Sequence, residues 1–258
     1  MTKIAHNKDL KKILKKYQNK IDNLVHVGAH LGQEVPLYQS ISTKKIYLFE
    51  PQKSLFNDLK NSLKQFENIF VYNCGLGSQN KFINLYKTKH NNGASSSVLK
   101  PHLHLNLHKN INFDEKEEIQ IKRFDSLNIK NIDFLTIDVQ GYELEVLRGF
   151  GKLLENLNFI YTEINKDFLY ENNVLIKELD IFLESKNFIR LKTFWDPYLP
   201  YGDAFFVKNI NINRSKILFY RVKKTFQDSF IYLIILRMIH INKGVFKIKQ
   251  KIKKIFLD

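Results

Sequence analysis

Leu24-Val25-His26-Val27-Gly28-Ala29-His30-Leu31-Gly32 places an apolar run before two glycines, and a second apolar run, Ile46-Tyr47-Leu48-Phe49, ends on Glu50. This order predicts a strand, a glycine turn, a helix, a second strand and an acid. In a doubly wound α/β sheet, the glycine turn brings backbone against a ligand, and the acid accepts hydrogen bonds from ribose hydroxyls. The stretch therefore predicts a site for a cofactor that contains a nucleoside.

The glycine spacing favours one cofactor. Gly28 and Gly32 are spaced as the outer glycines of Gly-x-Gly-x-Gly, the pattern for S-adenosylmethionine (SAM), and His30 stands in the middle place. The Gly-x-Gly-x-x-Gly pattern of dinucleotide sites is absent, which disfavours a nicotinamide-dependent dehydrogenase. The residues that we expect to bind the cofactor are His26, Gly28, Ala29, His30, Gly32, Glu34, Glu50, Asn73, Cys74, Gly75 and Asp138.

Charge divides the chain into three parts. The 258 residues carry a formal net charge of +15, of which +6 lies in residues 1–20 and +10 in residues 209–258. The stretch from 21 to 208 is nearly neutral and is long enough to bury one sizeable core. We therefore expect a basic N-terminal helix at 1–20, a catalytic domain at 21–208 and a basic amphipathic tail at 209–258.

The predicted compartment is the cytoplasm. A single cysteine, Cys74, excludes an internal disulfide and a zinc site with several cysteines. Residues 1–20 lack the apolar core of a signal peptide. The apolar run from Ser229 to Leu236 stops at Arg237, far short of the roughly 20 residues that a membrane-spanning helix needs.

Apolar periodicity predicts an alternating series of strands and helices. The expected architecture is five parallel strands plus a terminal antiparallel pair. A polar insertion at 88–114, between two antiparallel strands, is a candidate for substrate recognition. The expected strands are 23–27, 45–49, 69–72, 81–86, 118–124, 133–137, 159–164, 188–194 and 204–207, and the expected helices are 33–40, 54–66, 142–154 and 175–186.

Further blocks make the sequence resemble the FkbM-type SAM-dependent methyltransferases. The resemblance covers roughly residues 21–208, and it implies a class I, Rossmann-like methyltransferase fold and methyl transfer to oxygen, commonly on sugars or polyketide-like hydroxyls. The blocks are Val27 to Glu34, Phe49-Glu50-Pro51, Gly93-Ala94-Ser95-Ser96-Ser97, Asp133 to Gly149, Thr162-Glu163-Ile164-Asn165 and Gly202-Asp203-Ala204.

Three residues depart from this family pattern. His26 stands where many class I enzymes have an acid that helps to hold the amino acid part of SAM, and His30 replaces the middle glycine. Glu34 is an alternative contact for that part of the cofactor. Gln140 replaces a glutamate, which removes one candidate base and leaves Asp138.

Two mechanisms fit the polar residues at the predicted strand ends. In the first, Asp138, Glu163 and Asn165 bind Mg²⁺, which lowers the pKa of the acceptor hydroxyl. In the second, a carboxylate or a histidine is a metal-free base. The candidate catalytic residues are Asp138, Glu163, Asp203 and His104.

The candidates for acceptor binding lie in the loops. Ser95, Ser96 and Ser97 form a polar turn, Tyr142 follows the Asp138 strand, and Trp195 offers a face for a sugar ring. In the segment 101–108, an extended backbone would place His102, His104 and His108 on one side. Exposed loop histidines, a base or substrate contact, and a zinc site are the alternatives there.

The leading functional hypothesis is a SAM-dependent O-methyltransferase acting on a sugar of a glycan or glycolipid precursor. The basic, apolar tail suits an anionic membrane surface at the inner face, with nucleic acid or a protein partner as rivals. The alternatives are a non-catalytic SAM-fold or glycan-binding protein and, third, a nucleic-acid methyltransferase, which the nearly neutral body disfavours.

Overall fold

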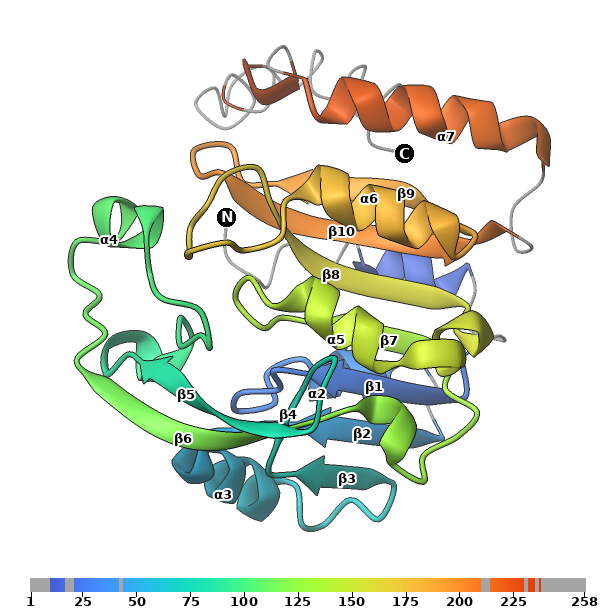
Figure 1. Cartoon of the computed structure of the whole chain (residues 1–258). Helices are drawn as coiled ribbons and strands as arrows, with labels where there is room; N and C mark the ends of the chain where they lie inside the picture. The colour runs from blue at the N-terminus through green and yellow to red at the C-terminus, as the bar shows by residue number, and fades with distance from the viewer. Residues whose placement is uncertain are drawn as a thin grey trace, which may run out of the picture.

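The computed structural model describes residues 10–16, 21–41, 44–209, 214–229, 232–234 and 237, and its centre is a seven-stranded sheet (Figure 1). Five neighbouring strands are parallel, and β10 runs antiparallel to both of its neighbours. The strand order is β3 (Ile69–Tyr72), β2 (Lys45–Phe49), β1 (Asn23–Val27), β7 (Phe134–Ile137), β8 (Phe159–Asn165), β10 (Tyr201–Lys208) and β9 (Phe188–Trp195). The predicted mostly parallel sheet with a terminal antiparallel strand is confirmed.

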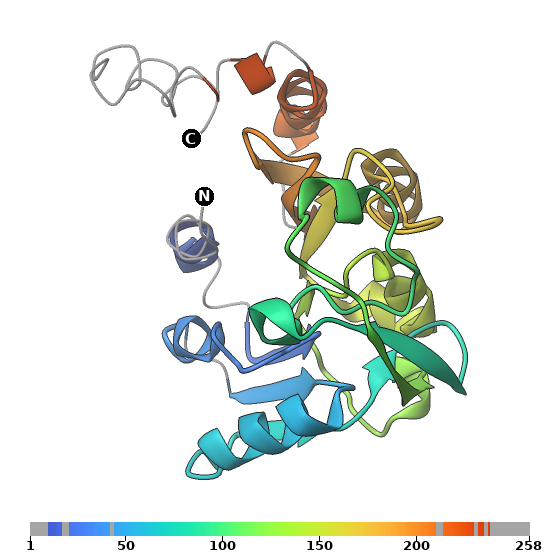
Figure 2. The same ribbon diagram turned by 90° about the vertical axis from the view of Figure 1, so that its left-hand side faces the viewer.

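Helices cover both faces of this sheet (Figures 1 and 2). Helices α2 (Val35–Gln39) and α3 (Lys53–Ser62) contribute Leu37, Tyr38 and Leu59 to the apolar core on one face. Helices α5 (Glu143–Gly149) and α6 (Ile176–Ser185) contribute residues such as Leu147 and Leu183 to the core on the other. Strands β1 and β7 are buried on both faces, which explains why they read as continuous apolar runs.

A second sheet of three strands lies beside the tips of β1 and β2. Its order is β4 (Gly75–Leu76), β6 (Glu115–Lys122) and β5 (Lys81–Lys87), and β5 pairs with β6 in the predicted antiparallel sense. The sequence did not predict β4, because a two-residue strand has no periodicity. The polar insertion between β5 and β6 contains the 3₁₀ turn η2 (His90–Gly93) and the helix α4 (Leu103–Leu107).

The prediction of an extended segment around the three histidines was wrong, because helix α4 forms there. The segment 102–108 is not extended, because the backbone amides of His102 and His104 both donate to the carbonyl of Leu169, at 2.8 and 3.1 Å, and the chain coils around this anchor. The side chain of His104 is buried, whereas that of His102 is exposed and lies 3.0 Å from the carbonyl of Phe168. The three histidines therefore do not share one side.

The predicted helix at 142–154 is broken. Helix α5 ends at Gly149, and a 3₁₀ turn, η4 (Gly151–Asn156), follows it; another such turn, η3 (Phe124–Ser126), follows β6. A Cβ atom at Gly149 would lie 2.1 Å from the carbonyl oxygen of Gly77. Because these two segments of the backbone approach so closely, position 149 requires glycine.

The described parts of both basic ends pack on the domain. Residues 10–15 are helical and bury Leu10, Ile13 and Leu14 in the core, whereas residues 1–9 and 17–20 of the predicted N-terminal helix lie outside the described residues. Helix α7 (Arg214–Gln227) lies along β9, and of the predicted tail 210–213, 230–231, 235–236 and 238–258 lie outside the described residues. Within the described part of the chain, no helix is both long and apolar enough to cross a membrane.

A buried arginine ties α7 to the domain. Arg190 on β9 is 1% exposed at its side chain and contacts Asp180 of α6 at 2.8 Å and Asp228, just after α7, at 2.5 Å. The indole nitrogen of Trp195 also donates to Asp228, at 3.2 Å. Asp228 therefore couples the end of α7 to two residues of β9.

Candidate active site

The strand register brings the predicted polar tips together. Val27 pairs with Phe49 on one side and with Ile137 on the other, so the next residues, Gly28, Glu50 and Asp138, end three adjacent strands. At Gly28 the φ angle is +82°, and a Cβ atom would lie 1.9 Å from the carbonyl oxygen of Asp138. Only glycine allows the first turn to pass this close to the end of β7.

Glu50 forms the floor of a cavity at this edge. Its carboxylate accepts hydrogen bonds from the backbone amides of His30, at 2.9 Å, and Gln52, at 2.8 Å. Burial raises the pKa of Glu50 to about 7, and the two amides oppose this rise. The carboxylate is thus held in a fixed position and has oxygen lone pairs left for a ligand.

His30 connects the glycine turn to the roof of the cavity. Its backbone has a φ of +49°, and its ring nitrogen Nε2 lies 2.7 Å from the carbonyl of Asn92. The amide of Gln33 donates to the other ring nitrogen at 2.8 Å, which makes Nε2 the donor to Asn92. The histidine in the middle place of the motif therefore closes the cavity with a hydrogen bond that glycine cannot make.

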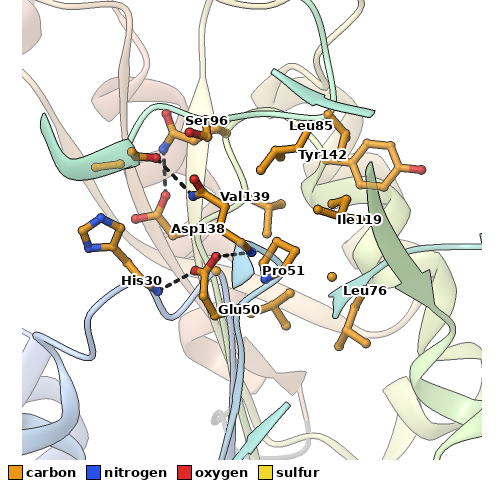
Figure 3. A pocket seen from close by; sticks show the side chains of 18 of the residues that line it. His30, Glu50, Pro51, Leu76, Leu85, Ser96, Ile119, Asp138, Val139 and Tyr142 are labelled. Carbon is orange, nitrogen blue, oxygen red and sulfur yellow. Dashed lines mark hydrogen bonds between the residues drawn. The ribbon is translucent and has the colours of Figure 1, made fainter. Parts of the chain in front are cut away.

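The cavity has a polar end and an apolar end, with Glu50 between them (Figure 3). His30 and Asp138 lie on the polar side, and the apolar side is built largely from the three-stranded sheet. The polar end also includes Gln33, Glu34, Asn92 and Gln140, and the apolar end includes Pro51, Leu76, Leu85, Val98, Ile119, Ile121, Val139 and Tyr142. Sequence analysis missed most of these apolar residues. Apolar and polar residues alternate along β5 and β6, and this alternation could have indicated that the apolar side chains share one face of the small sheet.

This arrangement fits a nucleoside cofactor with a charged tail. An acid between an apolar slot and a polar end matches a ribose that lies between a flat base and an amino acid group. Glu50 would hold the ribose hydroxyls, the apolar residues would cover the base, and Glu34 and His30 lie at the end where an amino acid group would bind.

Several residues predicted to bind the cofactor do not line this cavity. His26 is buried beneath it, and its ring nitrogen Nδ1 lies 3.0 Å from the hydroxyl of Tyr38. The side-chain amide of Asn73 donates to the backbone carbonyls of Glu50 and Pro51, at 3.1 and 2.9 Å, and so stabilises the backbone that carries Glu50. Ala29, Gly32 and Cys74 are also absent from the lining, and burial raises the pKa of Cys74 to about 11.

A second cavity adjoins the first, and Ala94, Asp138 and Gln140 line both. The second cavity is polar and contains three of the predicted catalytic residues besides Asp138, namely His104, Glu163 and Asp203. Its remaining lining residues are Ser95, His108, Ile111, Leu169, Asp196, Tyr201 and Gly202. A molecule in the second cavity can therefore meet a cofactor only past Asp138, Gln140 and Ala94.

Gln140 holds two carboxylates at this boundary. Its Nε2 atom donates to Asp138 Oδ1 at 2.8 Å and to Glu163 Oε2 at 2.6 Å, and its Oε1 atom lies 3.0 Å from the hydroxyl of Tyr170. The antiparallel register then pairs Glu163 with Asp203, which adds a third carboxyl group to the cluster. The glutamine that departs from the family pattern thus donates to groups that a glutamate would repel.

Burial and mutual repulsion keep part of this cluster protonated. Burial, followed by the nearby charge of Asp138, raises the pKa of Glu163 well above its ordinary value. Glu143, which accepts a hydrogen bond from the amide of Gly141 at 2.9 Å, has its pKa raised to about 7 by burial. Burial and the charge of Asp138 therefore both favour the protonated form of Glu163.

Burial also favours the neutral form of His104, although the pKa of a histidine moves in the opposite direction. Burial, assisted by the neighbouring ring of His108 at 4.7 Å, lowers the pKa of His104 to about 4. Its Nδ1 atom is buried and has no hydrogen-bond partner among the described residues. A buried polar atom without a hydrogen-bond partner costs free energy. Such an atom in a cavity is typical of a group that forms a hydrogen bond to a ligand.

The residues predicted to bind the acceptor divide between three places. Ser95 lines the second cavity, Ser96 and Tyr142 line the first, and Ser97 donates from its hydroxyl to the carbonyl of Gln140 at 2.8 Å. Trp195 lines neither cavity; its indole contacts Lys166, whose Nζ atom lies 4.2 Å from the ring centroid. Of the three histidines considered in the insertion, His104 and His108 line the second cavity. Sequence analysis did not single out Tyr170, Asp196 or Tyr201, which only the packing of distant loops brings here.

The residues proposed for Mg²⁺ do not form a metal site. Within the described residues, no group of three or more His, Cys, Asp or Glu is placed to hold a metal ion. The amide of Gln140 stands between Asp138 and Glu163, and Asn165 lines neither cavity. The donor set required by the metal mechanism is therefore not assembled.

The sheet order, the antiparallel β10 and the cavity at the ends of β1 and β2 define the class I, Rossmann-like methyltransferase fold. A family model, the methyltransferase FkbM domain, matches residues 26–190. Because that range is more than half of the chain, the protein belongs to the FkbM methyltransferase family.

Individual relatives are distant. The 2-O-methyltransferase NoeI of Sinorhizobium fredii (strain NBRC 101917 / NGR234) is 22% identical over 166 residues, which cover 60% of this chain and 68% of NoeI. A methyltransferase FkbM from Methylobacillus flagellatus KT has a TM-score of 0.49 and 13% identity, covering 73% of this chain and 44% of that one. The magnesium protoporphyrin IX methyltransferase ChlM from Synechocystis PCC 6803 has a TM-score of 0.47 and 10% identity, covering 79% of this chain and 78% of ChlM.

Proposed function

We propose that this protein is a SAM-dependent O-methyltransferase that methylates a hydroxyl group. The proposed acceptor is a sugar of a surface glycan or glycolipid precursor. The observation that carries the proposal is the shared wall of the two cavities. Asp138 and Gln140 lie between a cavity that fits a nucleoside and a polar cavity rich in carboxyl groups and histidines. Membership of the FkbM family and the similarity to a 2-O-methyltransferase support transfer to oxygen.

SAM bound in the first cavity would supply an electrophilic methyl group. The work left for the protein is to orient the acceptor oxygen, to remove its proton and to exclude water. A hydroxyl oxygen that gains a methyl group becomes strongly acidic, so a weak base placed beside it is sufficient.

Asp138 is the residue proposed to accept this proton. It lies on the shared wall, where the acceptor oxygen must approach the cofactor, and Gln140 fixes its carboxylate by donating to Oδ1. Burial raises the pKa of Glu163, which favours its neutral form and so limits the negative charge beside Asp138.

The second cavity is proposed to hold the acceptor through its other hydroxyl groups. A neutral His104 offers an unpaired nitrogen, and Asp203 and Asp196 offer carboxyl groups along the same lining. Several acceptors and donors around a small polar space suit a polyhydroxylated ring better than a simple alcohol.

Two measurements test the proposal. Calorimetry with S-adenosylhomocysteine measures cofactor binding; no binding would favour the non-catalytic alternative. Incubation with methyl-labelled SAM and fractionated cell glycans and lipids should label one fraction with an alkali-stable methyl ether.

Variants then assign the roles. Asp138→Asn keeps the size of the side chain and should lower kcat by about 10²- to 10⁴-fold, the usual range for loss of a proton-transfer group. The matched control, Glu155→Gln, alters an exposed carboxylate outside both cavities and should leave kcat unchanged. His104→Phe should raise KM for the acceptor more than it lowers kcat; the reverse would make His104 the base.

A further inference from the structure

Three segments line the second cavity, and each also carries an exposed apolar side chain. In α4, His104 and His108 line the cavity, whereas Leu105 and Leu107 are 45% and 37% exposed. Exposure of an apolar side chain to water does not stabilise a short helix. Helix α4 therefore exposes two leucines, on either side of the exposed Asn106, next to two histidines that line the second cavity.

The other two segments also place an exposed apolar side chain within two positions of a lining residue. Leu169 lines the cavity, and its neighbour Phe168 is 43% exposed. Asp196 lines the cavity, and Tyr198, two residues along, is 50% exposed. We name the four exposed side chains, Leu105, Leu107, Phe168 and Tyr198, the apolar rim.

Backbone hydrogen bonds hold the segments of the apolar rim together. The amide of Leu103 donates to the carbonyl of Phe168 at 3.2 Å, and the amide of Lys166 donates to the carbonyl of Pro200 at 2.7 Å. Both α4 and the loop between β9 and β10 lie on the same side of the molecule in Figure 1, where the parallel strands end. The three segments that carry the rim are therefore joined to one another beside the second cavity.

A positively charged side chain, that of Arg237, contacts the segment that carries one residue of the apolar rim. Arg237 donates from its Nε atom to the carbonyl of Pro197 at 2.8 Å, next to Tyr198. Arg237 belongs to the stretch 209–258, which carries twelve Lys and Arg against two Asp. Lys109, just after α4, is exposed as well.

We propose that the apolar rim, together with Arg237 and Lys109, docks on an anionic lipid bilayer, so that the second cavity opens toward a hydroxylated head group carried by a lipid. Apolar side chains that enter the head-group region, together with cationic residues that face anionic lipids, are the two contributions that bind proteins to such surfaces. This inference rests on the proposed function for its acceptor, but the docking itself requires no catalysis.

The composition of the apolar rim favours a bilayer over a soluble protein partner. Leucine and phenylalanine enter the acyl boundary, tyrosine suits the interface, and Arg237 and Lys109 match the sign of an anionic surface. Each rim residue lies one or two positions along the chain from a residue that lines the second cavity, so a docked bilayer would lie next to that cavity.

Vesicle binding by the full chain tests the docking. Cosedimentation should show binding to vesicles of phosphatidylcholine mixed with phosphatidylglycerol, and about tenfold weaker binding to phosphatidylcholine alone. The double variant L105E/L107E should weaken binding to the mixed vesicles by about tenfold or more, because it places charge where acyl chains lie.

A matched control separates the apolar rim from exposed apolar residues in general. Ile181 on α6 is 72% exposed and lies outside the rim, so Ile181→Glu should bind mixed vesicles as the unaltered protein does. Circular dichroism and S-adenosylhomocysteine binding must be retained in every variant, which keeps the failure of docking distinct from failure of the fold or of the proposed function.

Insertion is measured directly with tryptophan. The chain has one tryptophan, Trp195, which is 3% exposed and gives a low baseline of quenching. In Leu105→Trp, brominated acyl chains should quench the added fluorescence, whereas Ile181→Trp should show no added quenching. Equal quenching of the two variants, equal vesicle binding by L105E/L107E, or a dimer that L105E/L107E dissolves would overturn the proposal.

Discussion

Gln140 donates from its Nε2 atom to Glu163 Oε2 at 2.6 Å while its own backbone has a φ of +55°. A residue other than glycine is strained in this region by about 1–2 kcal/mol. The same side chain also donates to Asp138, and so the strained turn places one amide between two carboxyl groups. We infer that the amide offsets this strain by relieving repulsion between the two acids.

Gln140→Glu tests this relationship. The new carboxyl group can no longer donate to both acids unless it is protonated, so the free energy of unfolding should fall by about 1–3 kcal/mol at pH 8. At pH 5 the carboxyl cluster holds more protons, and the loss should be smaller. Urea titrations at both pH values measure it, and an equal loss at both would contradict the bridging role of Gln140.

Glu50 gives a pH dependence to cofactor binding. Its folded-state pKa is raised to about 7, so at pH 6 most of the protein carries a neutral Glu50. Ribose hydroxyls donate to the ionised form and favour it, so S-adenosylhomocysteine affinity should rise by about one log unit per pH unit below pH 7 and level off above it.

The control for this prediction is Glu50→Gln. The amide does not titrate, and the variant should bind S-adenosylhomocysteine more weakly at pH 8, with the Glu50 component of the pH dependence removed. Calorimetry between pH 5.5 and 8.5 measures both proteins. If the variant keeps the full slope, another group titrates in its place.

The same pKa shift affects stability with the opposite sign. Because the folded state holds the Glu50 proton more tightly than the unfolded state, this group stabilises the fold at low pH, and its contribution is lost as pH rises from about 4.5 to about 7. Glu50→Gln should therefore flatten the unfolding free energy across that window.

Gly28→Ala should prevent the first turn from forming. The added Cβ atom would lie 1.9 Å from the backbone oxygen of Asp138, which cannot move without shifting the end of β7. We expect a loss of about 3 kcal/mol or more in the free energy of unfolding, or failure to fold. A thermally stable variant that binds S-adenosylhomocysteine normally would show that the turn is looser than this contact implies.

Arg190→Met should release α7 from the domain. The substitution leaves Asp180 and Asp228 without their buried partner, which typically costs about 3–5 kcal/mol. Lys44→Met is the matched control, since Lys44 pairs with Asp22 on the exposed surface and should have little effect. Chemical denaturation measures both, and protease sensitivity after residue 208 should increase in Arg190→Met alone.

Particular elements show where sequence analysis succeeded and where it failed. The strands from Asn23 to Val27 and from Phe134 to Ile137 were predicted closely because both are buried on two faces and therefore read as unbroken apolar runs. Helix α4 was predicted as extended because its shape depends on the carbonyl of Leu169, some sixty residues away. The extent of helix α5 was predicted wrongly because the close approach of Gly77 ends it at Gly149.

The sequence by itself determined the parallel sheet, the glycine turn and the positions of Gly28, Glu50 and Asp138, because local periodicity and strand ends encode them. Only the tertiary structure decided that His26 pairs with Tyr38 outside the cavity lining, that His30 closes the cavity, and that His104 and His108 line one cavity with Glu163 and Asp203. These contacts join segments far apart in the chain, and their geometry depends on how loops pack on the sheet. A one-dimensional pattern does not carry that information.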